Sequence, residues 1–196
     1  MSESRWITVL QRSLGKFGWL GLLLGIIARF GYLLYILYGI AEWFRPGSYR
    51  ERQGRRHTLL YCLFSVLVGS TVSLFTGLLW RRQRPFVADR NVKAIIPHRA
   101  NASFPSNHSA NSLAISLQLL RTQPAAGLAF LAWSLVIGFS RVFCGIHYAT
   151  DVLAGFGLGI LSYIAVRRRA WAQRLAAQVC YVYDSCGAFI RTWRRL

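Results

Sequence analysis

Acidic side chains are scarce in this chain. Asp and Glu together account for 6 of its 196 residues, against 24 Lys or Arg, so the formal net charge is +18. A surplus of this size favours anionic partners, either lipid headgroups or a substrate that carries phosphate. Binding to nucleic acid would produce a similar charge. The arginines here flank apolar runs, however, and this placement favours lipid and predicts no nucleic-acid partner.

Several other features are sparse or missing. The chain has only four cysteines, which are Cys62, Cys144, Cys180 and Cys186. No pair of them has the spacing of a metal site, and we expect neither a disulfide framework nor a bound metal. The N-terminal region lacks a cleavage pattern of small residues, so no removable signal peptide is expected. We find no internal repeat and no low-complexity linker.

Long apolar runs are what the chain has in abundance, since 54% of its residues are hydrophobic. The runs cover residues 17–44, 58–80, 106–120, 125–139 and 151–166. Their lengths predict helices that cross or enter a membrane. The expected fold is therefore all-α, a single domain over 1–196 that forms a polytopic bundle of five to six membrane helices.

The two ends of the chain are more polar. Residues 1–16 mix apolar and basic side chains, which is typical of a short amphipathic helix lying on the membrane. Residues 167–196 open with three arginines and continue with apolar residues near helical spacing, which predicts a basic interfacial tail. Arg29 interrupts the first apolar run, and an arginine in mid-bilayer is costly. Either Arg29 faces a polar interior or the run breaks there, and we favour the break.

The distribution of basic residues predicts an orientation. If the helices alternate in direction, the loop at 45–57, Arg121 and the tail lie on one side with thirteen basic residues. The opposite side holds ten, several of which we expect to bind substrate. The positive-inside rule then places the thirteen-residue side in the cytoplasm.

One polar stretch, residues 140–151, lies between two apolar runs. It contains Arg141, His147 and Asp151. If a helix starts near His147, the histidine and Asp151 are four residues apart on one face. The carboxylate could then hold one ring nitrogen and leave the other free as a nucleophile, with Arg141 as an anion clamp. The alternative is a histidine and a carboxylate that merely cap a helix at the membrane surface.

Two further stretches carry similar chemistry. Arg84-Pro85 directly follows the run at 58–80. Pro105-Ser106-Asn107-His108 opens the next run, where Ser106 is a good N-cap and the first helical N–H groups can bind phosphate. Each stretch alone could be an interfacial anchor. Helix parity puts all three at the same side of the membrane, which favours a shared site over chance.

Taken in order, the three stretches resemble the signature of the type 2 phosphatidic acid phosphatase superfamily, R-P, then P-S-x-H, then S-R-x5-H-x3-D. The resemblance covers about residues 58–166, which we expect to be the catalytic core. Residues 84–106 are most similar to bacterial undecaprenyl-diphosphatases of the bacitracin-resistance type. There are two departures: Gly77 stands where the superfamily pattern has a lysine, and Asn107 replaces the usual glycine or aspartate.

The resemblance implies a phosphohistidine mechanism without a cofactor. His147 would attack phosphorus, Asp151 would hold its tautomer, and His108 would protonate the leaving oxygen and later activate water. The expected phosphate ligands are Arg84, Arg141 and the N–H groups at Ser106 and Asn107. The product would be undecaprenyl phosphate, the carrier of cell-wall precursors. The implied location is the bacterial cytoplasmic membrane, with the site facing outside.

Gly77 cannot supply the charge of the missing lysine. Arg81 follows Gly77 by four residues and lies on the same face if the helix persists. We therefore expect Arg81 to be an additional phosphate ligand. Arg82, about 100° further around the helix, is expected to meet headgroups.

Two alternatives remain at this point. One is a phosphatase of the same superfamily that acts on phosphatidic acid or phosphatidylglycerol phosphate. The other, of a different class, is a non-enzymatic protein that binds or transports anionic lipid. The remaining histidines, His57 and His98, are expected to be loop residues without a catalytic role.

Overall fold

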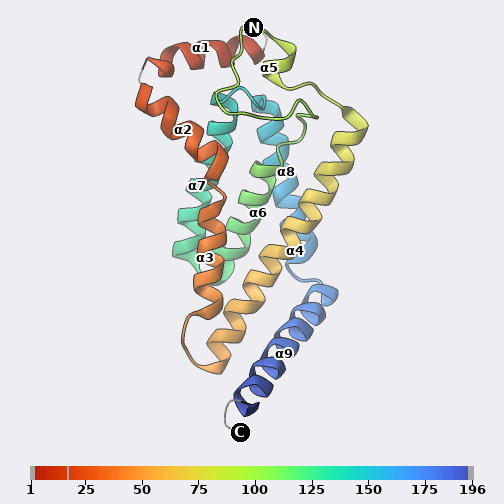
Figure 1. Ribbon diagram of the computed structural model, residues 1–196. Coiled ribbons are helices and arrows are strands. Elements are labelled where there is room, and N and C mark those ends of the chain that lie inside the picture. Colours follow the sequence, from red (N-terminus) through yellow and green to blue (C-terminus); the bar gives the residue numbers. More distant parts are fainter. Residues whose placement is uncertain (1–2, 17, 194–196) are drawn as a thin grey trace.

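A computed structural model shows an all-helical protein, and the part of the chain that it describes contains no strand (Figure 1). The structure describes residues 3–16 and 18–193, without the side chains of 187–193. Residues 1–2, 17 and 194–196 therefore lie outside the described residues, and the single domain over 1–196 stays a prediction. The helices are α1 (Glu3–Gly15), α2 (Gly18–Phe30), α3 (Leu33–Phe44), α4 (Tyr49–Trp80), α5 (Pro85–Ala88), α6 (Asn107–Thr122), α7 (Pro124–Phe143), α8 (Ala149–Val166) and α9 (Ala170–Trp193).

The predicted membrane bundle is confirmed as a fold class. Among the described residues, three helical stretches are long and apolar enough to cross a membrane, and they span Tyr49–Ala88, Pro124–Phe143 and Ala149–Val166. The pair α2 and α3 makes a fourth if it counts as one bent span. The helix α6 is a further member of the bundle, and α4, α7 and α8 surround it (Figure 1). Shelter inside protein explains why α6 carries polar side chains that lipid would not tolerate.

The first apolar run does break close to Arg29. Helix α2 ends at Phe30, and α3 continues at an angle of 51°. The carbonyl oxygen of Gly31 at the bend accepts a 2.9 Å hydrogen bond from the indole of Trp133. A Cβ at Gly31 would lie 3.1 Å from Ile137, so glycine permits the close contact between this bend and α7. The break thus falls two residues after the position expected from the sequence.

Glycines bring α6 and α8 into contact at backbone distance. A Cβ at Gly155 would lie 2.5 Å from the carbonyl oxygen of Ser106, and one at Gly159 would lie 2.5 Å from that of Ala110. No side chain fits in either place. The N-terminal turns of α6 and α8 are therefore held next to each other, and these turns carry the polar stretches identified in the sequence.

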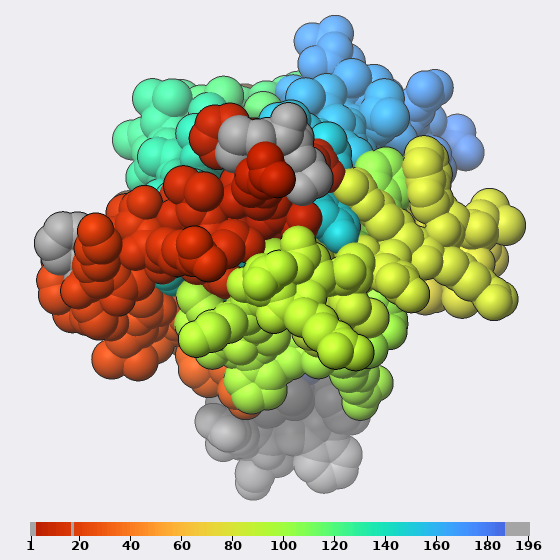
Figure 2. Space-filling view, turned by 90° about the horizontal axis from the view of Figure 1, so that it is seen from above, coloured from red at the N-terminus to blue at the C-terminus, as the bar shows by residue number. Residues whose placement is uncertain are grey.

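Helix α1 and the segment 84–106 close one end of the bundle. Figure 2 looks down on this end and shows the two side by side across it. Ile7 of α1 is buried against Val92 and Tyr148. The side-chain amide of Gln11 donates to the backbone carbonyl of Lys93 at 2.8 Å and accepts from the backbone N–H of Lys93 at 3.1 Å. It also donates to the carbonyl of Phe143 at 2.9 Å. The predicted amphipathic helix is present, and its contacts are with the protein as well as with any membrane surface.

The C-terminal helix α9 packs along the first half of α4 at the other end. Ala172, Ala176 and Cys180 are buried against Leu60 and Phe64. Further along the helix, Asp184 forms a 2.8 Å ion pair with Arg56 of α4. The interfacial location predicted for the tail stays a prediction, since these contacts concern only its inner face.

Candidate active site

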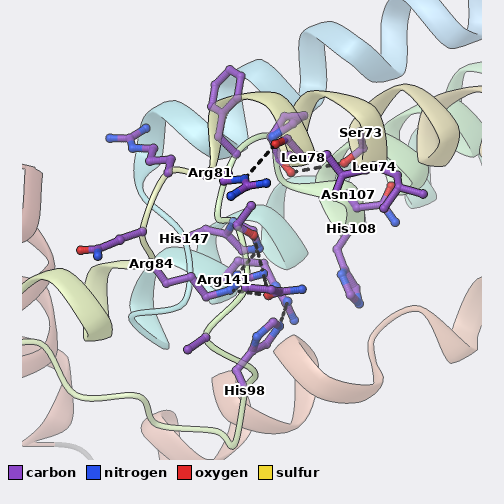
Figure 3. Close-up of a pocket in the computed structure, with 18 of the residues that line it drawn as sticks. Ser73, Leu74, Leu78, Arg81, Arg84, His98, Asn107, His108, Arg141 and His147 are labelled. Carbon is purple, nitrogen blue, oxygen red and sulfur yellow. Dashed lines mark hydrogen bonds between the residues drawn. The ribbon is translucent and has the colours of Figure 1, made fainter.

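A cavity of about 640 Å³ opens beneath the segment 84–106, and the polar stretches meet in it (Figure 3). Its walls come from α4, α6, α7 and the two segments that follow α4 and α7. The charged and imidazole side chains that line it are Arg81, Arg82, Arg84, His98, His108, Arg141 and His147. Asp151 and Ser106 are fully buried behind this wall.

All N–H groups of the Arg84 guanidinium make hydrogen bonds, and these bonds hold the side chain in place. Its Nη1 bonds the carbonyl of Ile146 at 2.7 Å and Nε2 of His147 at 3.1 Å. Its Nε and Nη2 both bond the Asn101 side chain, at 3.1 and 2.9 Å, and Nη2 also bonds the carbonyl of Ala102 at 3.0 Å. With 5% of its surface exposed, the guanidinium is held rigidly beside His147. This is the geometry of a preorganised anion ligand.

His147 lies in the turn between α7 and α8, and its tautomer follows from its neighbours. A guanidinium can only donate, so Nε2 of His147 must accept and carries the lone pair. The proton is therefore on Nδ1, which lies 3.6 Å from Oδ2 of Asp151. Burial, and to a lesser extent the charges of Arg141 and Arg84, lowers the pKa of His147 to about 4, although Asp151 acts in the opposite direction. The result is a neutral imidazole whose Nε2 carries a lone pair and accepts a hydrogen bond from Arg84.

Asp151 reaches His147 by a different route from the one predicted. Helix α8 begins at Ala149, so His147 precedes it and the two side chains do not share a helical face. Instead Oδ2 of Asp151 accepts a 2.9 Å hydrogen bond from the backbone N–H of Tyr148. The same oxygen also accepts from the hydroxyl of Ser103. This cap at the start of α8 directs the carboxylate toward Nδ1.

Arg141 and His98 form a second contact between an arginine and a histidine. Nη2 of Arg141 lies 3.2 Å from Nε2 of His98, and Nη1 donates to the carbonyl of Ala28 in α2 at 2.6 Å. Burial is the main cause that lowers the pKa of His98. Its ring centroid is 6.5 Å from that of His147. Sequence reasoning gave His98 no role in the site because the loop that contains it, residues 89–106, has no periodicity to reveal which side chain turns inward.

The start of α6 contributes His108 and backbone donors. Ser106 is the N-cap but makes no capping bond with its side chain, so the first-turn N–H groups that follow it remain available. The N–H of Ser106 itself is not available, because it donates to the backbone carbonyl of Asp151 at 2.9 Å. The phosphate contact expected at Ser106 is therefore wrong for this N–H in the state described. Asn107 and His108 both line the cavity.

Arg81 and Arg82 are arranged differently from the sequence-based expectation. Helix α4 ends at Trp80, and Arg81 takes a left-handed conformation with φ of 44°. The helical angle between the two residues then no longer applies. Arg82 does not face headgroups: its Nη1 donates to Oδ1 of Asp151 at 2.7 Å. Arg81 lines the cavity, and its role as a phosphate ligand stays a prediction.

An apolar groove of about 390 Å³ begins at Asn107 and His108 and runs between α3 and α4. It shares Tyr35, Ile36 and Leu63 with a second apolar pocket of about 420 Å³. That pocket extends as far as Trp43 and Phe44, near the end of α3. The polar cavity and the apolar groove share Asn107 and His108 as lining residues, so the two lie next to each other.

The arrangement of Arg84, His108, Arg141, His147 and Asp151 agrees with a comparison of the whole sequence. The profile of the PAP2 superfamily matches residues 58–175, which include all three polar stretches. The chain belongs to the PAP2 superfamily. The family resemblance found in the sequence is confirmed, and the protein is a phosphatase of the bacterial membrane.

One curated relative and two solved structures show which members of the superfamily the chain is similar to. The chain is 34% identical over 135 residues to undecaprenyl-diphosphatase BcrC of Bacillus subtilis (strain 168), covering 69% of this chain and 67% of that protein. The crystal structure of Aquifex aeolicus LpxE matches with a TM-score of 0.62 at 20% identity, covering 74% of this chain and 84% of the other. A PAP2-type phosphatidylglycerolphosphate phosphatase from Bacillus subtilis matches with a TM-score of 0.58 at 21% identity, covering 83% of each chain. The two structures establish the shared fold.

Proposed function

We propose that the protein hydrolyses undecaprenyl diphosphate to undecaprenyl phosphate and inorganic phosphate. The reaction would return the lipid carrier of cell-wall precursors to its monophosphate form. The similarity to undecaprenyl-diphosphatase BcrC supports this choice of substrate. The proposal rests on one observation above all: Nε2 of His147, a residue that lines the cavity, lies 3.1 Å from Nη1 of Arg84, a donor that leaves this nitrogen its lone pair.

The first half-reaction follows from this geometry. The lone pair on Nε2 of His147 attacks the terminal phosphorus, and the bond from phosphorus to the bridging oxygen breaks. The hydrogen bond from Arg84 to Nε2 ends when the lone pair of Nε2 bonds to phosphorus. The N–H of Arg84 then donates to an oxygen of the transferred phosphoryl group. Asp151 stabilises the positive charge that develops on the ring. The negative charge of the bound diphosphate favours a protonated His108, and this imidazolium donates a proton to the leaving oxygen.

The second half-reaction uses the same groups in reverse. His108, now neutral, removes a proton from water, and the water oxygen attacks the phosphorus of the phosphohistidine. The bond between phosphorus and Nε2 breaks, which returns the lone pair to His147 and releases inorganic phosphate. Arg141 and the free N–H groups at the start of α6 hold the remaining oxygens during both steps.

The apolar groove supports a lipid substrate with a long chain. It begins beside His108, where the leaving oxygen must be protonated, and continues between α3 and α4 into the second pocket. A prenyl chain attached to the diphosphate would occupy this track while its headgroup lies in the polar cavity. The positive-inside bias supports a site on the outer face of the membrane.

Phosphate release by the purified protein tests the proposal. The panel should contain undecaprenyl diphosphate, farnesyl diphosphate, phosphatidic acid and phosphatidylglycerol phosphate, all assayed with EDTA present. We expect the highest kcat/KM with undecaprenyl diphosphate. A preference for phosphatidylglycerol phosphate would instead favour the activity named for the Bacillus subtilis structure. Lipid binding without any release of phosphate would indicate a non-enzymatic protein.

A further inference from the structure

The cavity contains the same contact between an arginine and a histidine twice. Nη1 of Arg84 faces Nε2 of His147 at 3.1 Å, and Nη2 of Arg141 faces Nε2 of His98 at 3.2 Å. The two imidazole rings are 6.5 Å apart between centroids and nearly perpendicular, at 77°. Figure 3 shows both histidines beside the arginines that they contact. The mechanism above uses the first of these contacts and gives His98 no task.

His98 is held in the cavity by the docking of its loop. The backbone N–H of Ile95 donates to the carbonyl of Cys144 at 3.1 Å. Ile96 is 9% exposed and packs against Phe143 and Ile146 in the core beneath the site. Two anchored residues therefore precede His98 by two and three positions. A side chain that only decorated a loop would not need this support.

The free nitrogen of His98 is its Nε2. Its Nδ1 lies 3.1 Å from the carbonyl oxygen of Arg99, which can only accept, so Nδ1 carries the proton. The Nε2 lone pair then faces Arg141. An ionised phosphate oxygen can only accept, so His98 binds a phosphate through Nε2 in its protonated form, which the negative charge of the phosphate favours.

Arg84 and Arg141 differ in how many of their N–H groups already have a hydrogen-bond partner in the protein. All five N–H groups of Arg84 already have protein partners, so the contact with His147 must open to receive a phosphate oxygen. Arg141 still has a buried Nε without a partner in the described structure. It can hold the phosphate at His147 through Nε while its Nη2 stays on the side of His98. The two contacts thus provide two adjacent places for phosphate, one at each histidine.

We propose that His98 is a ligand of the inner phosphate of a lipid diphosphate and gives the site its preference for diphosphates over monophosphates. The inference rests on the proposed function, because only a diphosphate has an inner phosphate. The terminal phosphate lies at Arg84 and His147, where it is attacked. The inner phosphate, which leaves with the lipid, lies at Arg141 and His98. A lipid monophosphate occupies the first place and leaves the second without an anion.

The test compares His98→Ala and His98→Gln with wild type and with His57→Ala. His57 is a matched control because it lies on α4 at the opposite end of the bundle, where its ring contacts Tyr61. Full-length protein in detergent is assayed with farnesyl diphosphate and with dioleoyl phosphatidic acid. Methylenediphosphonate and orthophosphate are then compared as competitive inhibitors, which measures each phosphate place without relying on turnover of a particular lipid.

We expect His98→Ala to raise the KM for farnesyl diphosphate and the inhibition constant of methylenediphosphonate about tenfold, the effect of one lost hydrogen bond to a charged group. The corresponding constants for phosphatidic acid and orthophosphate should change much less, and kcat should change less than KM. His98→Gln should recover part of the loss, since its amide can still donate. His57→Ala should behave as wild type.

Equal increases in KM and in the inhibition constants for the diphosphate and monophosphate compounds would overturn the inference. Such equal increases are what a general disturbance of the site would produce. No change with either class would overturn it as well. Failure of the proposed function has a different signature: wild-type protein would release no phosphate from lipid diphosphates while hydrolysing phosphatidic acid. In that case the two inhibitors still decide whether His98 binds a second phosphate.

Discussion

Nη1 of Arg82 donates a 2.7 Å hydrogen bond to Oδ1 of Asp151, a carboxylate with no exposed surface. A buried carboxylate without a countercharge would be costly, and Arg82 provides that charge. The bond also fixes one oxygen of Asp151 and leaves the other for Tyr148, Ser103 and His147. We therefore infer that Arg82 is a positioning residue, which acts through Asp151 on His147, the proposed nucleophile.

Replacing Arg82 should therefore reduce kcat rather than substrate affinity. Arg82→Ala removes one charge-assisted hydrogen bond that holds Asp151, and a loss of about 2–3 kcal/mol in transition-state stabilisation corresponds to roughly two orders of magnitude in kcat. Arg82→Lys should recover part of the loss by retaining the charge. Steady-state kinetics with a lipid diphosphate measures both values.

Arg81→Ala is the matched comparison, because Arg81 lines the cavity but does not contact Asp151. If Arg81 is a phosphate ligand, its replacement should raise KM by about tenfold and should alter kcat less than Arg82→Ala does. Equal, small effects of the two substitutions would mean that both arginines serve only as interfacial anchors.

Loss of the nucleophile should abolish turnover. His147→Ala removes the atom that attacks phosphorus, and His147→Gln keeps a polar side chain without a comparable lone pair. We expect kcat/KM to fall at least about a thousandfold in both. Vanadate should inhibit the wild-type protein because it mimics five-coordinate phosphorus. Phosphate release by His147→Ala at the wild-type rate would exclude the phosphohistidine route.

The pH dependence should show a nucleophile that stays neutral in mild acid. Because burial lowers the pKa of His147 to about 4, from an ordinary value of 6.5, Nε2 remains unprotonated between these values. Over the same interval the unfolded chain binds more protons than the folded one, so His147 makes the fold less stable as pH falls from 6.5 toward 4. Nitrogen NMR of His147, assigned with His147→Gln, should show the neutral Nδ1–H tautomer at pH 5.5. An imidazolium at that pH would contradict the expectation.

The side of the membrane can be tested with two cysteines. Ala88 is exposed beside the site, and Cys186 is exposed on α9 at the far end of the bundle. In intact cells, a membrane-impermeant thiol reagent should label Ala88→Cys in a background without native cysteines. It should not label a chain that keeps Cys186 alone. The opposite pattern would place the site in the cytoplasm.

Expression in a sensitive bacterium should raise resistance to bacitracin. The antibiotic sequesters undecaprenyl diphosphate, so faster hydrolysis of that lipid leaves it less target. The minimum inhibitory concentration for cells that express wild-type protein is compared with the value for His147→Ala at matched protein levels. Unchanged resistance together with strong hydrolysis of phosphatidic acid would favour the alternative substrate.

The sequence predicted the parts of the fold that depend on long-range patterns. Apolar runs set the helices, Arg29 indicated the break between α2 and α3, and helix parity placed Arg84, His108 and His147 at one level. These features arise from the cost of polar groups in lipid, which is visible in the residue order.

Contacts fixed by local backbone geometry could not be predicted in the same way. Arg81 has a left-handed conformation at the end of α4, and this turns Arg82 inward toward Asp151 instead of outward. Because α8 starts at Ala149, Asp151 is held by a hydrogen bond from the backbone N–H of Tyr148 and not by sharing a helical face with His147. His98 depends on the docking of a loop, which no periodicity describes. A histidine placed between two motif residues of one site was the only available signal.

The contact between α1 and the site also determines when the site can form during synthesis. Oε2 of Glu3 accepts from Nη2 of Arg82 at 2.5 Å and from the hydroxyl of Thr150 at 3.1 Å, which joins residues 147 positions apart. Helix α1 leaves the ribosome before α4 and α8, and its Glu3 has neither of these two partners until Arg82 and Thr150 have been made. Its amphipathic face allows it to wait at the membrane surface in the meantime. A chain that stops before Thr150 lacks both the hydrogen bond from Thr150 to Glu3 and the carboxylate of Asp151. An incompletely synthesised protein therefore has no assembled phosphatase centre.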